Sequence, residues 1–292
     1  MSTGRREDPA VERLAIPVPG LPATLAATVT VPERTAPDAV AVLWPALGVK
    51  ADHYRAFAAE LARTGFAVVA VDLRGQGASR PRPGRATRHG YHELATVDWP
   101  AVLRAVRDRF GTLPVHSVGH SLGGQLSLLH AAAHPGAVDG VVLVAAGSVD
   151  HRGFPGLHGP RVLAATHLTA AVAGAVGYWP GDRLGFAGRQ SAVLLRDWAR
   201  ICRTGRFEPA GADRDYEALL AGATVPVLAV SMAGDRLAPV PAVDRLCAKV
   251  PAAPVTRHHH GADAARPPDH FRWVRDSGAI ADRIRAWADA LR

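Results

Sequence analysis

Short apolar segments alternate with amphipathic segments through most of this 292-residue chain, and this alternation constrains the fold more than any other feature. Residues 66–72, FAVVAVD, form a continuous apolar run, which is typical of a strand buried on both faces. Residues 54–65 before it place Phe57 and Leu61 on one face of a predicted helix. Further strands are predicted at residues 21–32, 39–45, 113–119, 138–147 and 225–234, and further helices at 101–111, 123–136 and the C-terminus. Strands that alternate with crossover helices favour an α/β fold, with a mostly parallel sheet and helices on both faces.

The stretch from residue 149 to residue 222 interrupts this rhythm. It separates two predicted strands and is far longer than the usual connection of a few residues. Helical patterns within it, such as SAVLLRDWARICRTG at 191–205, indicate a helical insert. We therefore predict a core formed by residues 1–148 and 223–292, and a cap or lid formed by residues 149–222.

The charge of the chain is strongly basic, with a formal net charge of +8. Lys50 and Lys249 are the only lysines, and the arginines are spread along the chain among acidic residues. A nucleic-acid partner needs a concentrated basic face. The one basic cluster, RPRPGRATRHG at 80–90, has the proline and glycine content of a loop. We predict no nucleic-acid partner.

Cysteine content and hydropathy bear on the compartment. Cys202 and Cys247 form neither a disulfide framework nor a metal-binding spacing, which favours a cytoplasmic protein with free thiols. No apolar run reaches about 18 residues, so we predict no membrane span. Residues 162–179 come nearest and predict a buried or cap helix. Residues 1–20 carry charge without an apolar stretch and do not resemble a signal peptide. The sequence does not indicate an oligomeric state.

Ser121 is the candidate nucleophile. It lies in Gly119-His120-Ser121-Leu122-Gly123, which fits the pattern G-x-S-x-G. A predicted strand precedes this motif and a predicted helix follows it. At such a sharp turn, side chains two residues on either side would collide, so glycines let the chain turn and expose the hydroxyl. The free N–H groups at the start of the helix suit a developing negative charge.

A nucleophilic serine needs a base, and the base needs an acid that orients it. In chains with this elbow the order is Ser, then Asp or Glu, then His. Asp235 follows a predicted strand, in the loop AVSMAGDRLAPV, where catalytic groups collect in open α/β sheets. Asp150, just past the preceding strand, is the alternative acid. Asp244 lies inside a predicted helix and is a poor candidate.

Two segments offer the histidine. His270 follows Pro267-Pro268-Asp269, where a loop must turn into a helix. His258, His259 and His260 form the other group. Consecutive residues on a strand alternate faces, so these three cannot converge on one metal ion. We predict no metal site, favour His270 as the base and keep His260 as the alternative.

From about residue 40 onward the chain resembles the α/β-hydrolase superfamily, and most closely its monoacylglycerol-lipase-like and serine-aminopeptidase-like branch. VGHSLGG at 118–124 and the block of Asp72, Arg74, Gly75, Gly77 and Ser79 carry the resemblance as a pair. GDRLAP and DHFRWVR, around the candidate acid and base, extend it. The resemblance implies Ser121, Asp235 and His270 as a triad, and a structural role for Asp72 and Arg74. The insert segments GYWPGDRLGF and DWARICR point more weakly to a little-characterised bacterial subgroup.

The resemblance also implies an oxyanion hole. One donor is the backbone N–H of Leu122. The other comes from an early loop, where relatives have H-G-x-G and a tyrosine six residues later. Here PALGVKADHY has that spacing, with Pro45-Ala46 in place of His-Gly, and Leu47 falls at the donor position.

We predict a serine hydrolase that cleaves an ester, thioester or amide of a small, apolar acyl substrate. This chemistry requires no metal or cofactor. An acyltransferase with the same triad is one alternative, because it differs only in the acceptor. A non-catalytic binding protein on the same scaffold is the other.

Overall fold

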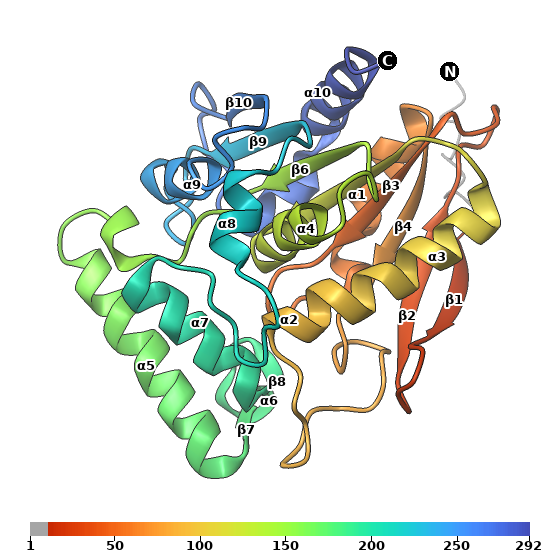
Figure 1. Cartoon of the computed structure of the whole chain (residues 1–292). Helices are drawn as coiled ribbons and strands as arrows, with labels where there is room; N and C mark the ends of the chain where they lie inside the picture. Colours follow the sequence, from red (N-terminus) through yellow and green to blue (C-terminus); the bar gives the residue numbers. More distant parts are fainter. Residues whose placement is uncertain (1–10) are drawn as a thin grey trace.

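A computed structural model describes residues 11–292 of the chain. Its centre is an eight-stranded sheet with the order β1-β2-β4-β3-β5-β6-β9-β10 (Figure 1). β1 and β2 are antiparallel to their neighbours, and the other six strands of this sheet are parallel to one another. The strands are β1 (Val11–Pro17), β2 (Thr24–Thr30), β3 (Ala39–Trp44), β4 (Phe66–Val71), β5 (Val115–His120), β6 (Gly140–Val144), β9 (Val227–Met232) and β10 (Val255–His260). The predicted α/β fold with a mostly parallel sheet is confirmed.

Helices cover both faces of this sheet. In β3, Val40 and Val42 pack in one apolar cluster with helices α3, α4 and α9, whereas Ala41 and Leu43 pack in another with α1 and α10. This alternation explains the continuous apolar runs in the sequence, because both faces of the strand are buried. The helices are α1 (Arg55–Arg63), α3 (Trp99–Phe110), α4 (Leu122–Ala133), α9 (Val240–Cys247) and α10 (Gly278–Asp289), with the short turns η1 (Ala51–Tyr54), α2 (Tyr91–Glu93), η2 (Leu94–Asp98) and η4 (Arg272–Asp276).

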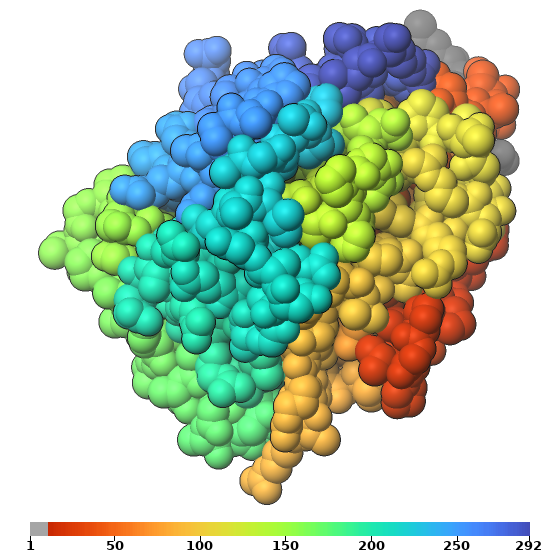
Figure 2. Space-filling model, in the orientation of Figure 1, coloured from red at the N-terminus to blue at the C-terminus, as the bar shows by residue number. Residues whose placement is uncertain are grey.

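Residues between β6 and β9 form a helical layer beside the sheet (Figures 1 and 2). The long helices α5 and α7 pack on each other, and β7 pairs with β8 in a small antiparallel hairpin. The elements are η3 (His151–Gly153), α5 (His158–Val176), β7 (Tyr178–Pro180), α6 (Gly181–Leu184), β8 (Gly188–Ser191), α7 (Ala192–Thr204) and α8 (Tyr216–Ala221). α8 differs from the others, because it packs on the core helix α4. We use "cap" for η3 through α7.

α5 corresponds to the apolar stretch at 162–179, yet much of its surface is exposed. Its buried residues include Thr166 and Thr169, whereas Leu168 is 67% exposed. α5 is exposed because it lies on the outside of the cap, although its sequence is apolar. None of the helices in residues 11–292 is both long enough and apolar enough to cross a bilayer.

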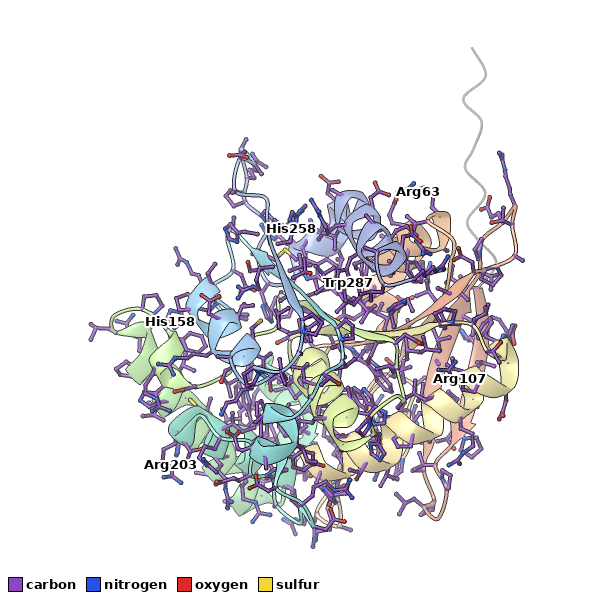
Figure 3. The ribbon with its side chains drawn as sticks, turned by 45° about the horizontal axis from the view of Figure 1, so that its top comes forward. Arg63, Arg107, His158, Arg203, His258 and Trp287 are labelled. Atoms are coloured by element: carbon purple, nitrogen blue, oxygen red, sulfur yellow. The ribbon has the colours of Figure 1, made fainter. Side chains whose placement is uncertain are left out.

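The basic residues are distributed over the surface. Figure 3 shows Arg63, Arg107 and Arg203 on well-separated elements. Several arginines are paired with acids: Arg63 lies 2.6 Å from Asp282. Such exposed pairs contribute little to stability.

Candidate active site

Ser121 lies at a sharp turn between β5 and α4. Its backbone has φ 53° and ψ −116°, a left-handed conformation that is rare for a residue other than glycine. A Cβ atom at Gly119 would lie 2.3 Å from the amide nitrogen of Gly124, and one at Gly123 would lie 2.4 Å from the carbonyl oxygen of Trp44. The close main-chain packing therefore requires glycine at both positions and holds Ser121 at the carboxyl end of the parallel strands.

Asp235 and His270 form a buried pair. Asp235 Oδ2 lies 2.8 Å from His270 Nδ1, and the Asp235 side chain is fully buried. The other carboxylate oxygen, Oδ1, accepts hydrogen bonds from the backbone N–H groups of Leu237 and Ala238, both at 2.8 Å. These bonds fix the carboxylate, and the carboxylate fixes the proton of the imidazole on Nδ1. The Nε2 lone pair is then available to accept a proton.

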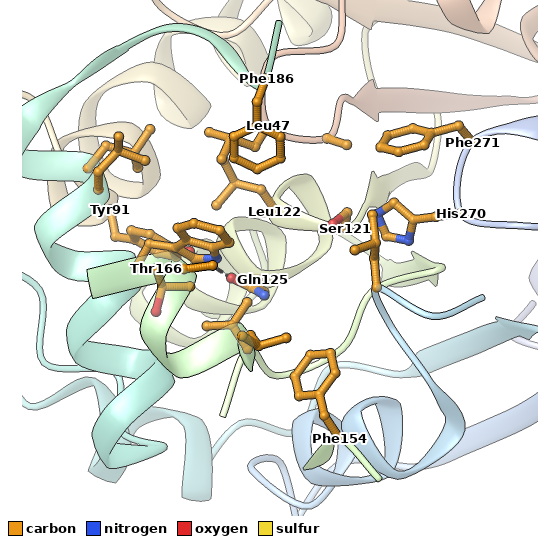
Figure 4. A pocket seen from close by; sticks show the side chains of 18 residues that line it. Leu47, Tyr91, Ser121, Leu122, Gln125, Phe154, Thr166, Phe186, His270 and Phe271 are labelled. Carbon is orange, nitrogen blue, oxygen red and sulfur yellow. Dashed lines mark hydrogen bonds between the residues drawn. The ribbon is translucent and has the colours of Figure 1, made fainter. Parts of the chain in front are cut away.

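Ser121 and His270 line the same cavity, which has a volume of about 270 Å³. Figure 4 shows the Ser121 side chain on the side of the cavity from which the His270 ring projects. No hydrogen bond joins the two side chains within residues 11–292. In sites without substrate this contact is often loose and tightens when substrate binds.

The alternative acid, Asp150, has other partners. Arg152 Nε donates to Asp150 Oδ1 at 2.9 Å, and Arg245 donates to Oδ2 at 3.0 Å. Burial alone would raise the pKa of Asp150, but its bonds to Arg152 and the charges of both arginines outweigh burial and lower that pKa. Asp150 therefore orients arginines and does not contact the imidazole of His270. Asp244 lies on α9, paired with Arg257.

The three consecutive histidines form the end of β10, at the edge of the sheet. His258 and His260 lie on one face with ring centroids 6.0 Å apart, and His259 Nδ1 lies 2.9 Å from Ser231 Oγ. Residues 11–292 contain no group of three or more His, Cys, Asp or Glu side chains that could hold a metal ion.

The loop after β3 leaves one backbone donor free. Ala46 N–H donates to Tyr54 Oη at 2.9 Å, and Gly48 N–H donates to Gln76 Oε1 at 2.9 Å. Within the described residues, the N–H groups of Leu47 and Leu122 have no hydrogen-bond acceptor, and both residues line the cavity beside Ser121. The loop thus leaves the Leu47 N–H free beside Ser121, although Pro45-Ala46 replaces the His-Gly pair of the relatives.

Tyr54 links this loop to the elbow. Its hydroxyl lies 2.7 Å from His120 Nδ1, and both side chains are fully buried. Burial lowers the pKa of His120 well below its usual range, so the imidazole is neutral. The Tyr54 hydroxyl thus accepts from Ala46 N–H and is also paired with His120 Nδ1, so it joins the loop to the elbow. The spacing of the motif predicts the position of Tyr54, but no sequence pattern indicates its bond to His120.

The block from Asp72 to Ser79 folds as a tight turn under the same loop. Asp72 Oδ1 accepts from Ala51 N–H at 2.7 Å, and Oδ2 accepts from Ala78 N–H at 2.8 Å. Arg74 forms a buried ion pair with Asp98. These contacts agree with the structural role expected for Asp72 and Arg74.

The family model described as alpha/beta hydrolase fold matches residues 42–188, which are 147 of the 292 residues and contain the serine elbow. The chain belongs to the α/β-hydrolase family. No curated protein matches the sequence significantly.

Solved structures of other α/β proteins superpose over nearly the whole chain of this α/β-hydrolase. An esterase from Pyrococcus furiosus has a TM-score of 0.61 at 13% identity, covering 97% of this chain and 93% of its own. The N-formylmaleamic acid deformylase of Pseudomonas putida S16 has a TM-score of 0.61 at 14% identity, covering 94% and 99%. An esterase from Rhodococcus sp. ECU1013 has a TM-score of 0.56 at 23% identity, covering 97% and 99%. These likenesses show the fold.

The cavity of this α/β-hydrolase lies between the core and the cap. Two of its polar side chains are held by hydrogen bonds. Tyr91 Oη donates to Gln125 Oε1 at 2.8 Å (Figure 4). Gln125 Nε2 donates to the carbonyl oxygen of Gly147 at 2.7 Å. Most of the lining is aliphatic or aromatic and comes from both layers: Leu47, Leu122, Val149, Phe154, Val162, Ala165, Phe186, Leu194, Leu195, Trp198, Leu237 and Phe271.

Proposed function

We propose that this protein is a serine hydrolase in which Ser121 is the nucleophile, His270 the general base and Asp235 the orienting acid. The buried Asp235–His270 pair, facing the same cavity as the strained Ser121, is the observation that supports this proposal. Asp150 and the histidines of β10 have other partners.

In the first step, His270 Nε2 takes the proton of Ser121 Oγ while Oγ attacks the carbonyl carbon of the substrate. The carbonyl oxygen becomes an oxyanion and accepts hydrogen bonds from the N–H groups of Leu47 and Leu122. His270 then returns the proton to the leaving group, and the acyl group stays on Ser121. Water, deprotonated by His270, releases the acid in the second half of the cycle.

The cavity supports an apolar acyl group as the substrate. A water molecule occupies about 30 Å³ of the liquid, so a cavity of this size holds on the order of nine heavy atoms of similar volume. We therefore expect p-nitrophenyl esters of medium-chain acids to have higher kcat/KM than the acetate or the palmitate. Equal rates for all three esters would contradict acyl binding in this cavity.

Intact-mass analysis after incubation with a fluorophosphonate probe tests the nucleophile. We expect one adduct on the wild type, none on Ser121→Ala, and labelling slowed at least about 100-fold in His270→Ala, because general-base catalysis supplies roughly 10²–10⁴-fold. His260→Ala is the matched control and should label normally. An adduct that persists in Ser121→Ala would refute the proposed nucleophile.

Asparagine substitutions test the acid. Asp235→Asn keeps the size of the side chain but removes the charge that orients the imidazole, so we expect kcat to fall by about 10⁴-fold. Steady-state kinetics on a p-nitrophenyl ester measures this. A decrease of less than tenfold would exclude Asp235 from the role.

A further inference from the structure

The tip of the cap hairpin lies directly against the loop that carries the Leu47 donor. A Cβ atom at Gly48 would lie 2.3 Å from both the carbonyl carbon and the carbonyl oxygen of Ala187, which precedes β8. Both residues have left-handed backbones, with φ of 77° at Gly48 and 59° at Ala187. Main chain therefore packs on main chain where the cap meets the loop after β3.

Two buried glutamines connect the same two segments. Gly48 N–H donates to Gln76 Oε1 at 2.9 Å, and Gln76 Nε2 donates to Gln190 Oε1 at 3.1 Å. Gln190 Nε2 in turn donates to the carbonyl oxygen of Ala187. Gln76 is 7% exposed and Gln190 is 1% exposed, so water does not compete readily for these bonds. We call this series of three hydrogen bonds the amide chain.

The amide chain has only one possible direction. Its first group, the Gly48 N–H, can only donate, and its last group, the Ala187 carbonyl, can only accept. Each glutamine must therefore accept on its oxygen and donate on its nitrogen, and flipping either amide would place like groups against each other. Both side chains must be amides for the chain of bonds to close.

Leu47 also contacts the cap through its side chain. The cap has a small apolar cluster of its own, formed by Ala173, Trp179, Ala192 and Leu195, and the half-buried Leu47 packs against it together with Ala187. Trp179 Nε1 donates to the carbonyl oxygen of Phe186 at 2.9 Å, which holds the hairpin tip in place. The side chain of Leu47 and the amide of its neighbour Gly48 are thus both attached to the cap.

From these contacts we infer that Gln76 and Gln190 are positioning residues, which set the Leu47 N–H of the oxyanion hole according to the position of the cap. This inference rests on the proposed function, because it assigns a cause to the geometry of that hole. The cap would then help to position the oxyanion hole, in addition to forming one wall of the cavity. The substrate's acyl group, by contacting Phe186 in the cap, would stabilise the same arrangement.

The test uses Gln76→Met, Gln190→Met and the double variant of the full chain. Methionine has nearly the same shape as glutamine and cannot donate the required hydrogen bond. With p-nitrophenyl butyrate, we expect each single variant to lose about 10- to 100-fold in kcat, since a displacement of the order of 1 Å in a catalytic group can cost about 10²-fold. KM should stay within about twofold, because the loss concerns the transition state. The double variant should lose no more than the worse single variant, since one broken bond opens the whole chain.

An alkyl trifluoromethyl ketone separates positioning from general destabilisation. Ser121 Oγ adds to the ketone carbon, its proton passes to His270, and the former carbonyl oxygen becomes an oxyanion in the hole. The inhibition constant should rise by the same factor by which kcat/KM falls, and the pH profile of kcat/KM should keep its midpoints because the Asp235–His270 pair is untouched. Leu168→Ala, an exposed change on the outer cap helix, is the control and should match the wild type in both measurements.

Two results would overturn the inference. If wild-type Ser121 is labelled but Gln76→Met and Gln190→Met keep their kcat and ketone affinity, the coupling is refuted and the proposed function stands. If Ser121 is not labelled at all, both fail together. If either methionine variant loses its thermal unfolding transition, leucine at the same position replaces it: leucine is apolar and has no hydrogen-bonding group, and an unchanged kcat would be equally decisive.

Discussion

The two proposed halves of the oxyanion hole are held in very different ways. The Leu122 N–H follows Ser121 directly, and the glycines at 119 and 123 fix it through main-chain contacts inside the core. The Leu47 N–H lies in a loop that depends on distant side chains, namely Tyr54 and the amide chain. The first half is thus fixed by main-chain packing within the core of the sheet. The second depends on the cap, so we expect it to be the adjustable half.

Among changes to the two halves of the oxyanion hole, Gly123→Ala should have the largest effect, because it disturbs the half that is fixed by main-chain packing. The added Cβ would lie 2.4 Å from the carbonyl oxygen of Trp44 and 2.9 Å from that of Pro45, at the end of a central strand that cannot move aside. We expect kcat/KM to fall by about 10³-fold, the upper value for loss of one oxyanion donor. The variant should also lose stability, by roughly 1–3 kcal/mol for overpacking.

Kinetics and thermal unfolding measure these two effects. Gly84→Ala is the matched control, since a Cβ there meets nothing within 4 Å, and it should behave like the wild type. Full activity in Gly123→Ala would show that the elbow is less tightly packed than described.

Gly48→Ala should have a smaller effect, because it breaks the adjustable half. Its Cβ would collide with Ala187 in the cap hairpin, and not with the end of a central strand as at Gly123. We expect kcat to fall by about 10- to 100-fold through misplacement of the Leu47 donor. Gly185→Ala is the control: its φ of 73° imposes the same backbone strain, yet nothing lies within 4 Å of its Cβ. Equal losses in the two variants would assign the effect to strain alone.

Asp150→Asn should have the smallest effect on activity, because Asp150 belongs to neither half of the oxyanion hole. Asp150 has arginine partners and does not contact Ser121 or His270. We expect kcat to stay within about threefold of the wild type, while the melting temperature falls because a buried charged partner of Arg245 is lost, at a cost of roughly 1–3 kcal/mol. A loss of activity comparable with that of Asp235→Asn would restore Asp150 as the candidate acid.

The sequence predicted the sheet well because its strands are buried on both faces. The run at 66–72 matches β4 (Phe66–Val71), and 225–234 contains β9. β1 was not predicted, because it is an edge strand with five exposed residues and lacks the continuous apolar run of the buried strands. The helix at 162–179 was found, but its exposure on the outside of the cap was not, since hydropathy does not report what a helix faces.

In the site, too, local sequence patterns predict some residues, and others depend on tertiary contacts. Ser121, Asp235 and His270 follow strands whose carboxyl ends meet at one edge, so motif and chain order locate them. In the structure, Ser121 and His270 line one cavity, and Asp235 contacts His270. Gln76 and Gln190 left no signal in the sequence, because a single glutamine is unremarkable until the fold brings it next to another. The amide chain depends on tertiary contacts that no local pattern encodes.

The single direction of the amide chain has an evolutionary consequence. Gln76 and Gln190 are 114 positions apart in the sequence, yet each side chain keeps all its hydrogen bonds in the amide chain only while the other is also an amide. A mutation of one codon leaves an unsatisfied buried amide group at the other, and a second mutation there removes that group from the interior. We therefore expect positions 76 and 190 to be replaced together across lineages. This pair would then link the evolution of the core to that of the cap, even where the rest of the cap diverges freely.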